Sequence, residues 1–125
     1  MNVPGENAMF AALGANETRE ILINGIKYKV TNTKNADNTL VYSMVGDTIK
    51  FTSGAGIIVE GDKNSSHKVD IAASNMTYKS GDQNDIIKIS AANITVFAGG
   101  GDDDITVDGY FATVYGERGT RLQAS

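Results

Sequence analysis

The sequence has no cysteine, one proline and one histidine among its 125 residues. The absence of cysteine excludes disulfide bonds and thiol catalysis, and it leaves the redox compartment undetermined. A lone histidine, His67, without cysteine or a second histidine, argues against a transition-metal site. We therefore expect His67 to be an ordinary surface residue in a turn.

The sequence also lacks a basic excess and long apolar runs. Lysine and arginine total 11 against 15 acidic residues, giving a net charge of −4. No nucleic-acid partner is expected, because nucleic acids and anionic membranes both require a basic face. No run of about eighteen apolar residues occurs, so no membrane span is predicted. Residues 1–20 lack the basic and apolar segments of a cleavable signal, while secretion stays open if the chain belongs to a larger polypeptide.

The abundant residues describe one folded domain with many turns. Hydrophobic residues make up 41% of the chain and there are 14 glycines, which together predict a soluble fold with many tight turns. A chain of this length buries one core. Residues 1–19 are predicted to be a lead-in, either flexible or forming a short helix over the Ala-rich stretch before Gly14.

Residues 20–45 are predicted to form a capping region. The dipeptide Asn24-Gly25 separates two apolar-rich runs, and Asn-Gly accepts the positive φ angles of a two-residue hairpin turn. A β-hairpin is therefore expected over residues 20–30. A further strand-like run, TLVYSMV, leads to Gly46.

A repeat of about eighteen residues covers residues 46–122. A shift of eighteen superposes residues of the same kind: Val69 on Ile87, Ile87 on Ile105, Asn75 on Asn93 and Asp85 on Asp103. Upstream, the match of GDKN with GDQN needs a shift of twenty, which we assign to a two-residue insertion at Ser65 and Ser66.

This periodicity predicts an all-β fold, a parallel β-solenoid of about four eighteen-residue coils. Apolar residues recur every nine positions rather than every six, which favours two facing sheets over a three-sided helix. The residues concerned are Val69, Tyr78, Ile87, Val96, Ile105 and Val114. A coil cannot bury its inward face alone, so the hairpin is expected to cap the N-terminal end.

Two stretches, SGDQNDII and AGGGDDDI, resemble the RTX, or hemolysin-type, calcium-binding nonapeptide repeat, written GGxGxDxU. The resemblance implies a parallel β-roll in which calcium lies between successive turns and takes carboxylate and carbonyl oxygens. The metal ligands that it implies are Asp82, Asp85, Gly99, Gly101 and Asp103. The resemblance also implies a bacterial source and export from the cell.

The departures from the RTX pattern restrict calcium to one place. The acidic position is occupied by other residues elsewhere: Met76, Ile94 and Ala112 on the opposite edge, His67 in the turn before, and Thr120 or Arg121 in the turn after. Only the pair Asp85 and Asp103 leaves carboxylates in adjacent turns. The alternative is that these aspartates are turn residues without a metal, because Asp, Asn and Gly favour tight turns. Against it, three adjacent carboxylates in GDDD repel one another.

Two further columns of residues are predicted from the repeat. Asn75 and Asn93 are expected to form a structural asparagine ladder. Phe97 and Tyr115 are expected to point outward. With Tyr110 and Phe111, these last two aromatics would make a surface for a protein partner, a glycan, or the rest of a larger polypeptide.

The sequence predicts a non-enzymatic module. It contains no nucleophile-elbow sequence and no phosphate loop of the Walker type. We expect a structural or adhesive module of a secreted or cell-surface bacterial protein, with calcium at one edge. Two alternatives stay open: a self-assembling solenoid that joins copies through its coil ends or aromatic face, and a carbohydrate-binding or carbohydrate-active β-helix module.

Overall fold

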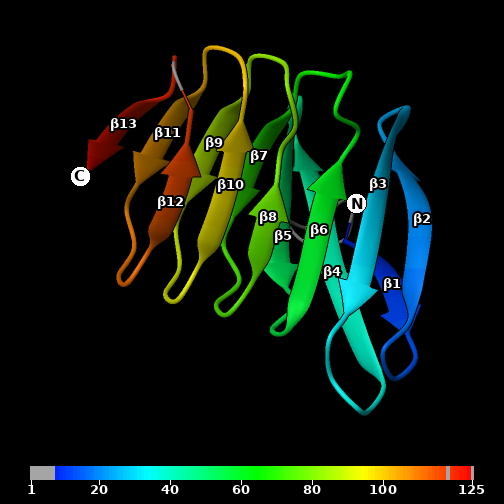
Figure 1. Cartoon of the computed structure of the whole chain (residues 1–125). Coiled ribbons are helices and arrows are strands. Elements are labelled where there is room, and N and C mark those ends of the chain that lie inside the picture. The colour runs from blue at the N-terminus through cyan, green and yellow to red at the C-terminus, as the bar shows by residue number, and fades with distance from the viewer. Residues whose placement is uncertain (1–7, 118, 125) are drawn as a thin grey trace, which may run out of the picture.

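The fold consists of two β-sheets that face each other (Figure 1). The computed structural model describes residues 8–117 and 119–124, and in them lie thirteen strands. The strands are β1 (Met9–Leu13), β2 (Thr18–Ile23), β3 (Ile26–Asn32), β4 (Asn38–Val45), β5 (Thr48–Ser53), β6 (Ile57–Gly61), β7 (Lys68–Ile71), β8 (Thr77–Lys79), β9 (Ile86–Ile89), β10 (Thr95–Gly99), β11 (Asp104–Val107), β12 (Thr113–Gly116) and β13 (Arg121–Ala124). In these residues no helix is long and apolar enough to cross a membrane.

The chain from β5 onward is a parallel β-solenoid, as the eighteen-residue period predicts. Each coil contributes one strand to each sheet, and the coils are β5–β6, β7–β8, β9–β10 and β11–β12, followed by β13. One sheet has the order β1-β4-β5-β7-β9-β11-β13 and the other β12-β10-β8-β6-β3-β2. The prediction of two facing sheets rather than three is confirmed.

The register confirms the period and corrects one detail. Ile87 pairs with Ile105 at a shift of eighteen, but Ile49 pairs with Val69 at a shift of twenty. Across the other sheet, β6 pairs with β8 at a shift of nineteen, placing Val59 beside Tyr78. One extra residue therefore lies in each of the two turns of the first coil. The predicted two-residue insertion in a single turn is wrong, because the two extra residues are divided between the two turns, and each turn changes the strand spacing by one residue.

The N-terminal end is capped by antiparallel strands on both sheets. The predicted hairpin is strands β2 and β3, and its turn has φ +53° at Asn24 and +79° at Gly25, as a two-residue turn of this type requires. Strand β3 then pairs antiparallel with β6, while β1 and β4 extend the other sheet. The cap therefore covers both sheets of the first coil.

The predicted short helix before Gly14 is wrong, because residues 9–13 form strand β1. Pairing with β4 buries Ala11 and Leu13 on alternate positions, so long-range burial overrides the helix preference of an Ala-rich segment. In the rest of the predicted lead-in, residues 14–17 connect β1 to β2 and residues 18–19 begin β2, while residues 1–7 lie outside the described residues.

The core lies between the sheets and consists of stacked columns of apolar side chains. Val69, Ile87 and Ile105 form one column, each 1% exposed. Burying a side chain of this size contributes about 1.5–3 kcal/mol, and each coil gains it only when the next coil covers it. The stack positions two features on its outside and at its edge: the Gly/Asp turns at the top of Figure 1, and the outer face of the β2–β12 sheet.

Candidate functional site

The Gly/Asp turns hold a buried column of polar side chains where the two sheets meet. Asp85 and Asp103 immediately precede β9 and β11, and their side chains point into the interior, where they are 1% and 2% exposed. His67 precedes β7 in the same column, and Thr120 precedes β13. The register places Asp104 beside Arg121, so Thr120 is the residue that follows Asp103 in the column.

Each aspartate accepts a hydrogen bond from the backbone one coil earlier. The distance from His67 N to Asp85 Oδ1 is 2.9 Å, and from Asp85 N to Asp103 Oδ1 it is 3.0 Å. A buried N–H without a partner costs about as much free energy as a lost hydrogen bond. The aspartates therefore stabilise the stack by accepting amides at the points where strands begin. Thr120 Oγ1 donates to Asp103 Oδ2 at 3.4 Å.

His67 is buried at 3% exposure, so the expectation of a surface turn residue is wrong. Its Nδ1 lies 3.1 Å from Asp85 Oδ1 and 3.3 Å from Ser80 Oγ, and its ring centroid lies 5.4 Å from that of Tyr28. The sequence pattern missed this because it treated the acidic column as a surface edge. Burial makes His67 part of the core.

The imidazole fits because Gly61 lies opposite it. A Cβ at Gly61 would lie 2.6 Å from His67 Nε2, closer than nonbonded atoms approach. In the following coils the facing residues are Ser80 and Ala98, which have a Cβ, and the column residue there is the shorter aspartate. The size of the column residue and the size of the facing residue are therefore matched, coil by coil.

The column places three ionisable side chains, His67, Asp85 and Asp103, in the buried interior. Burial and the adjacent Asp85 carboxylate raise the pKa of Asp103 to about 7. Burial, with Asp85 as a second cause, raises the pKa of Tyr28 well above its ordinary range. Among the described residues, Asp85 Oδ2 and His67 Nε2 are buried without a hydrogen-bond partner.

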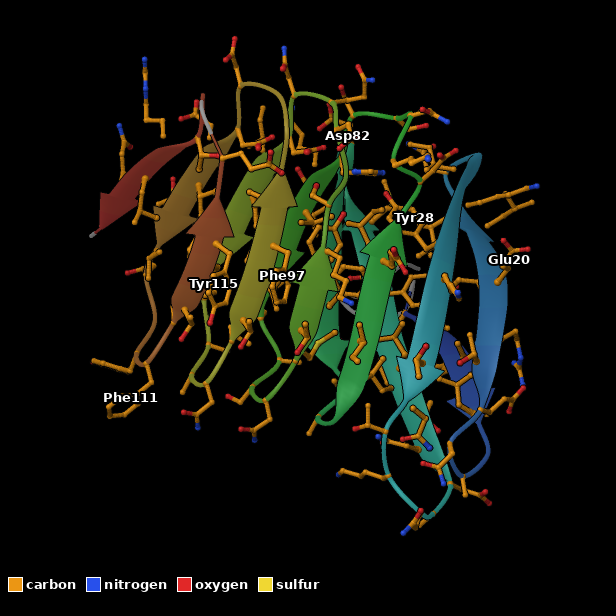
Figure 2. All side chains as sticks on the ribbon, in the orientation of Figure 1. Glu20, Tyr28, Asp82, Phe97, Phe111 and Tyr115 are labelled. Carbon is orange, nitrogen blue, oxygen red and sulfur yellow. The ribbon has the colours of Figure 1, made fainter. Side chains whose placement is uncertain are left out.

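Of the ligands that the RTX resemblance implies, the structure brings only two side chains together. Asp85 and Asp103 are neighbours in the buried column, whereas Asp82 is exposed in the outer part of its turn (Figure 2). Gly99 and Gly101 have φ of +73° and +90°. Their Cα atoms lie against backbone carbonyls of the previous coil, where a Cβ would collide. Close stacking of the turns is reason enough for these glycines.

This donor set does not by itself fit a calcium ion. Calcium takes six to eight oxygen ligands, and the part of the chain that the structure describes holds no group of three or more His, Cys, Asp or Glu side chains arranged to hold a metal. In addition, Oδ1 of both Asp85 and Asp103 already accepts a backbone N–H. Calcium binding stays a prediction, to be tested in solution.

The second feature is an exposed aromatic pair on the outer sheet face. Phe97 and Tyr115 point outward as predicted, 38% and 55% exposed (Figure 2). Their rings stack with centroids 4.8 Å apart and planes 13° apart, and Lys79 Nζ lies 5.7 Å from the Phe97 ring centroid. Such contacts stabilise an exposed face modestly, by about 0.5–1 kcal/mol for the cation–π pair.

The opposite turns contain a column that needs positive φ. Asn75 and Asn93 have φ of +63° and +59°, and no side-chain hydrogen bond joins them in the described residues. Asparagine suits these positions because it tolerates the left-handed backbone conformation. The expected ladder of side-chain amides does not form between them. Phe111 occupies the same position one coil later with φ of +58°. It is 80% exposed, and Tyr110 beside it is 76% exposed.

Comparison with known proteins finds no matching family model, no matching curated protein and no matching solved structure. The resemblance to RTX repeats therefore rests on the repeat and the turn residues alone, while the β-solenoid itself is a direct structural result.

Proposed function

We propose that the chain is a non-enzymatic structural module, a short and rigid β-solenoid that serves as a spacer or adhesive segment and makes contacts through its outer faces. The observation that carries the proposal is the continuous parallel ladder from β5 to β13, in which each coil is held by its neighbours. The polar turns join the coils by further hydrogen bonds from one coil to the next.

The buried column supports a structural rather than a catalytic role. The side chains of His67 and Asp85 are 0% exposed and pack against one another inside the stack. Asp70, a carboxylate on an outer sheet face, accepts a hydrogen bond from Ser90 Oγ at 2.7 Å, which ties it to the adjacent coil. The carboxylates of Asp70, Asp85 and Asp103 thus form hydrogen bonds that join adjacent coils of the stack.

Hydrogen exchange in excess EDTA tests the proposal. A preformed spacer predicts slow amide exchange in all strands from β5 to β11 at low protein concentration, with no ligand added. Rapid exchange that slows only after a ligand is supplied would show a module that folds on binding, contrary to the proposal. Release of reducing ends from uronic-acid polysaccharides, abolished by Asp70→Asn, would contradict the non-enzymatic assignment.

We also propose that the module belongs to a secreted or cell-surface bacterial protein related to the RTX group. The support is the stack of about four eighteen-residue coils together with the paired aspartates in adjacent turns. A calcium ion at the turn edge would then need oxygen ligands beyond the side chains of Asp85 and Asp103. This part of the proposal depends on the resemblance, and its test is the calcium-dependent melt described in the Discussion.

A second candidate function is carbohydrate binding at the tip formed by Tyr110 and Phe111. The observation in its favour is the strained backbone of Phe111, since strained residues are retained where they serve a contact. Phe111→Asn restores the residue type found at positions 75 and 93 and removes the ring. A glycan array on which the parent chain binds a sugar and this variant does not would support the candidate, and an array blank for the parent chain would remove it.

A further inference from the structure

Six exposed side chains form a straight row across the whole outer face of the β2–β12 sheet. The strand registers pair them one after another: Glu20 with Lys29, Lys29 with Glu60, Glu60 with Lys79, Lys79 with Phe97, and Phe97 with Tyr115. Each residue lies on a different strand, and all six are exposed. Figure 2 shows Glu20 at one end of the sheet and Tyr115 at the other.

Three of the four charged residues of this row, Glu20, Lys29 and Glu60, form no ion pair within the described residues. In the part of the molecule that the structure describes, the ion pairs within 4.0 Å involve other residues: Arg19 with Glu17, His67 with Asp85, and Lys68 with Asp47. Glu20, Lys29 and Glu60 alternate in sign and stand free of ion pairs, and Lys79 contacts the Phe97 ring. The exposed side chains of this row are therefore available to contact a partner.

The two ends of the row differ in shape. The end formed by the cap and β6 is hollowed, with a depression of about 290 Å³ lined by Glu20, Lys27, Lys29, Glu60, Gly61 and Asp62. The other end carries the stacked rings of Phe97 and Tyr115. A shallow, charged hollow and a protruding aromatic pair thus lie on one face.

A two-fold axis parallel to the strands, between β6 and β8, makes this face complementary to itself. Rotation about that axis opposes two sheets and reverses the order of the row, so the first residue faces the sixth of the other copy. The opposed pairs are Glu20 with Tyr115, Lys29 with Phe97, and Glu60 with Lys79. These are a carboxylate facing a tyrosine, a cation facing an aromatic ring, and an ion pair.

The neighbouring row allows such an approach because its side chains are short. It runs along the same strands and consists of Thr18, Thr31, Ile58, Thr77, Thr95 and Thr113. The same rotation opposes this row to itself. Its short side chains leave the closest contacts between the two copies to the row of longer side chains.

We propose that the outer face of the β2–β12 sheet is an isologous docking surface for a second copy of this chain. The inference rests on the proposed structural role and names its partner and face. Six strands spaced about 4.8 Å apart and about five residues long give a contact of roughly 400 Å² per copy. That area lies below the standard interface of about 800 Å² per partner, so the dimer is weak and forms at high local concentration.

Charge reversal at the centre of the row is the sharpest test. Glu60→Lys places lysine against Lys79 of the other copy, and Lys79→Glu places glutamate against Glu60, so each variant alone should stay monomeric. Mixed together, the two variants restore both central ion pairs between unlike chains. Lys88→Glu carries the same charge change as Lys79→Glu on the other sheet, where Lys88 is exposed, and serves as the matched control.

Sedimentation equilibrium from about 10 μM to about 1 mM covers the range of weak association. The parent chain and the Lys88→Glu control should shift from monomer toward dimer, each reversed variant should not, and an equimolar mixture should associate again. A parent chain that stays monomeric throughout overturns the inference. Association that persists unchanged in both reversed variants also overturns it, and would place the contact at the coil ends. Slow hydrogen exchange in a monomeric chain would leave the spacer function intact in either case.

Discussion

The sharpest prediction for stability concerns the proton on Asp103. In the folded chain its pKa is raised from 3.8 to about 7, so between these values the folded state binds a proton that the unfolded state has released. Stability therefore falls as pH rises through this window, is highest below about pH 4, and reaches its lower plateau above about pH 7. The usual behaviour of a carboxylate that is stabilised in its charged form is the reverse.

The size of this loss in the free energy of unfolding follows from the pKa shift of Asp103. A difference of about three pKa units corresponds to about 4 kcal/mol between pH 4 and pH 8. Relaxation of the surrounding protein reduces the effective cost of a buried charge, so we expect about half of this loss, roughly 2 kcal/mol.

The perturbation is Asp103→Asn, which keeps an oxygen to accept the Asp85 N–H and cannot ionise. Urea unfolding in EDTA should give nearly equal stability for the two proteins at pH 4.5. At pH 8 the variant should be more stable by about 2 kcal/mol, the charge cost being absent. The contributions of the other titrating groups cancel when the unfolding free energies of the two proteins are subtracted at each pH. A variant that is less stable at pH 8, or a difference that does not change with pH, would refute the reasoning.

Three further outcomes are expected. Gly61→Ala should destabilise the fold by about 1–3 kcal/mol, because its Cβ must displace the buried His67 ring; urea unfolding measures this, and an unchanged midpoint would show that the ring has room to move. Phe111→Asn should stabilise by about 0.5–1 kcal/mol by relieving the positive φ, seen as a higher melting temperature; a lower one would mean that the exposed ring contributes packing. If calcium binds, millimolar calcium but not magnesium should raise the melting temperature relative to EDTA, and Asp103→Asn should abolish the rise; an unmoved melt would mean that the aspartates act without metal.

The solenoid could be predicted from the sequence because its determinant is local and repeated. Apolar residues nine positions apart, such as Val69 and Tyr78, recur in the coils from β7 to β12, whose turns have the same length. The cap could be predicted only in part. The Asn24-Gly25 turn marks the hairpin, but nothing local in residues 9–13 announces that they pair with a strand about thirty residues later.

The buried column shows why the candidate site was harder to predict. An aspartate before a strand has the same sequence signature whether its carboxylate binds a cation or accepts the amide of the previous coil. The burial of His67 depends on the absence of a side chain at Gly61 on the facing strand, which no spacing reveals. The row from Glu20 to Tyr115 was missed for a related reason, since two of its six residues, Glu20 and Lys29, lie in cap strands outside the repeat.

The aspartate column also limits how long a uniform version of this rod could become. Adding a coil that copies the turn of Asp85 would keep every backbone bond and lengthen the stack by about 4.8 Å. It would also bury one more carboxylate beside two that already compete for charge. In the chain as it stands, His67 ends the run on one side and Thr120 on the other. The identity of a single residue per turn can thus set the number of coils that remain stable at neutral pH.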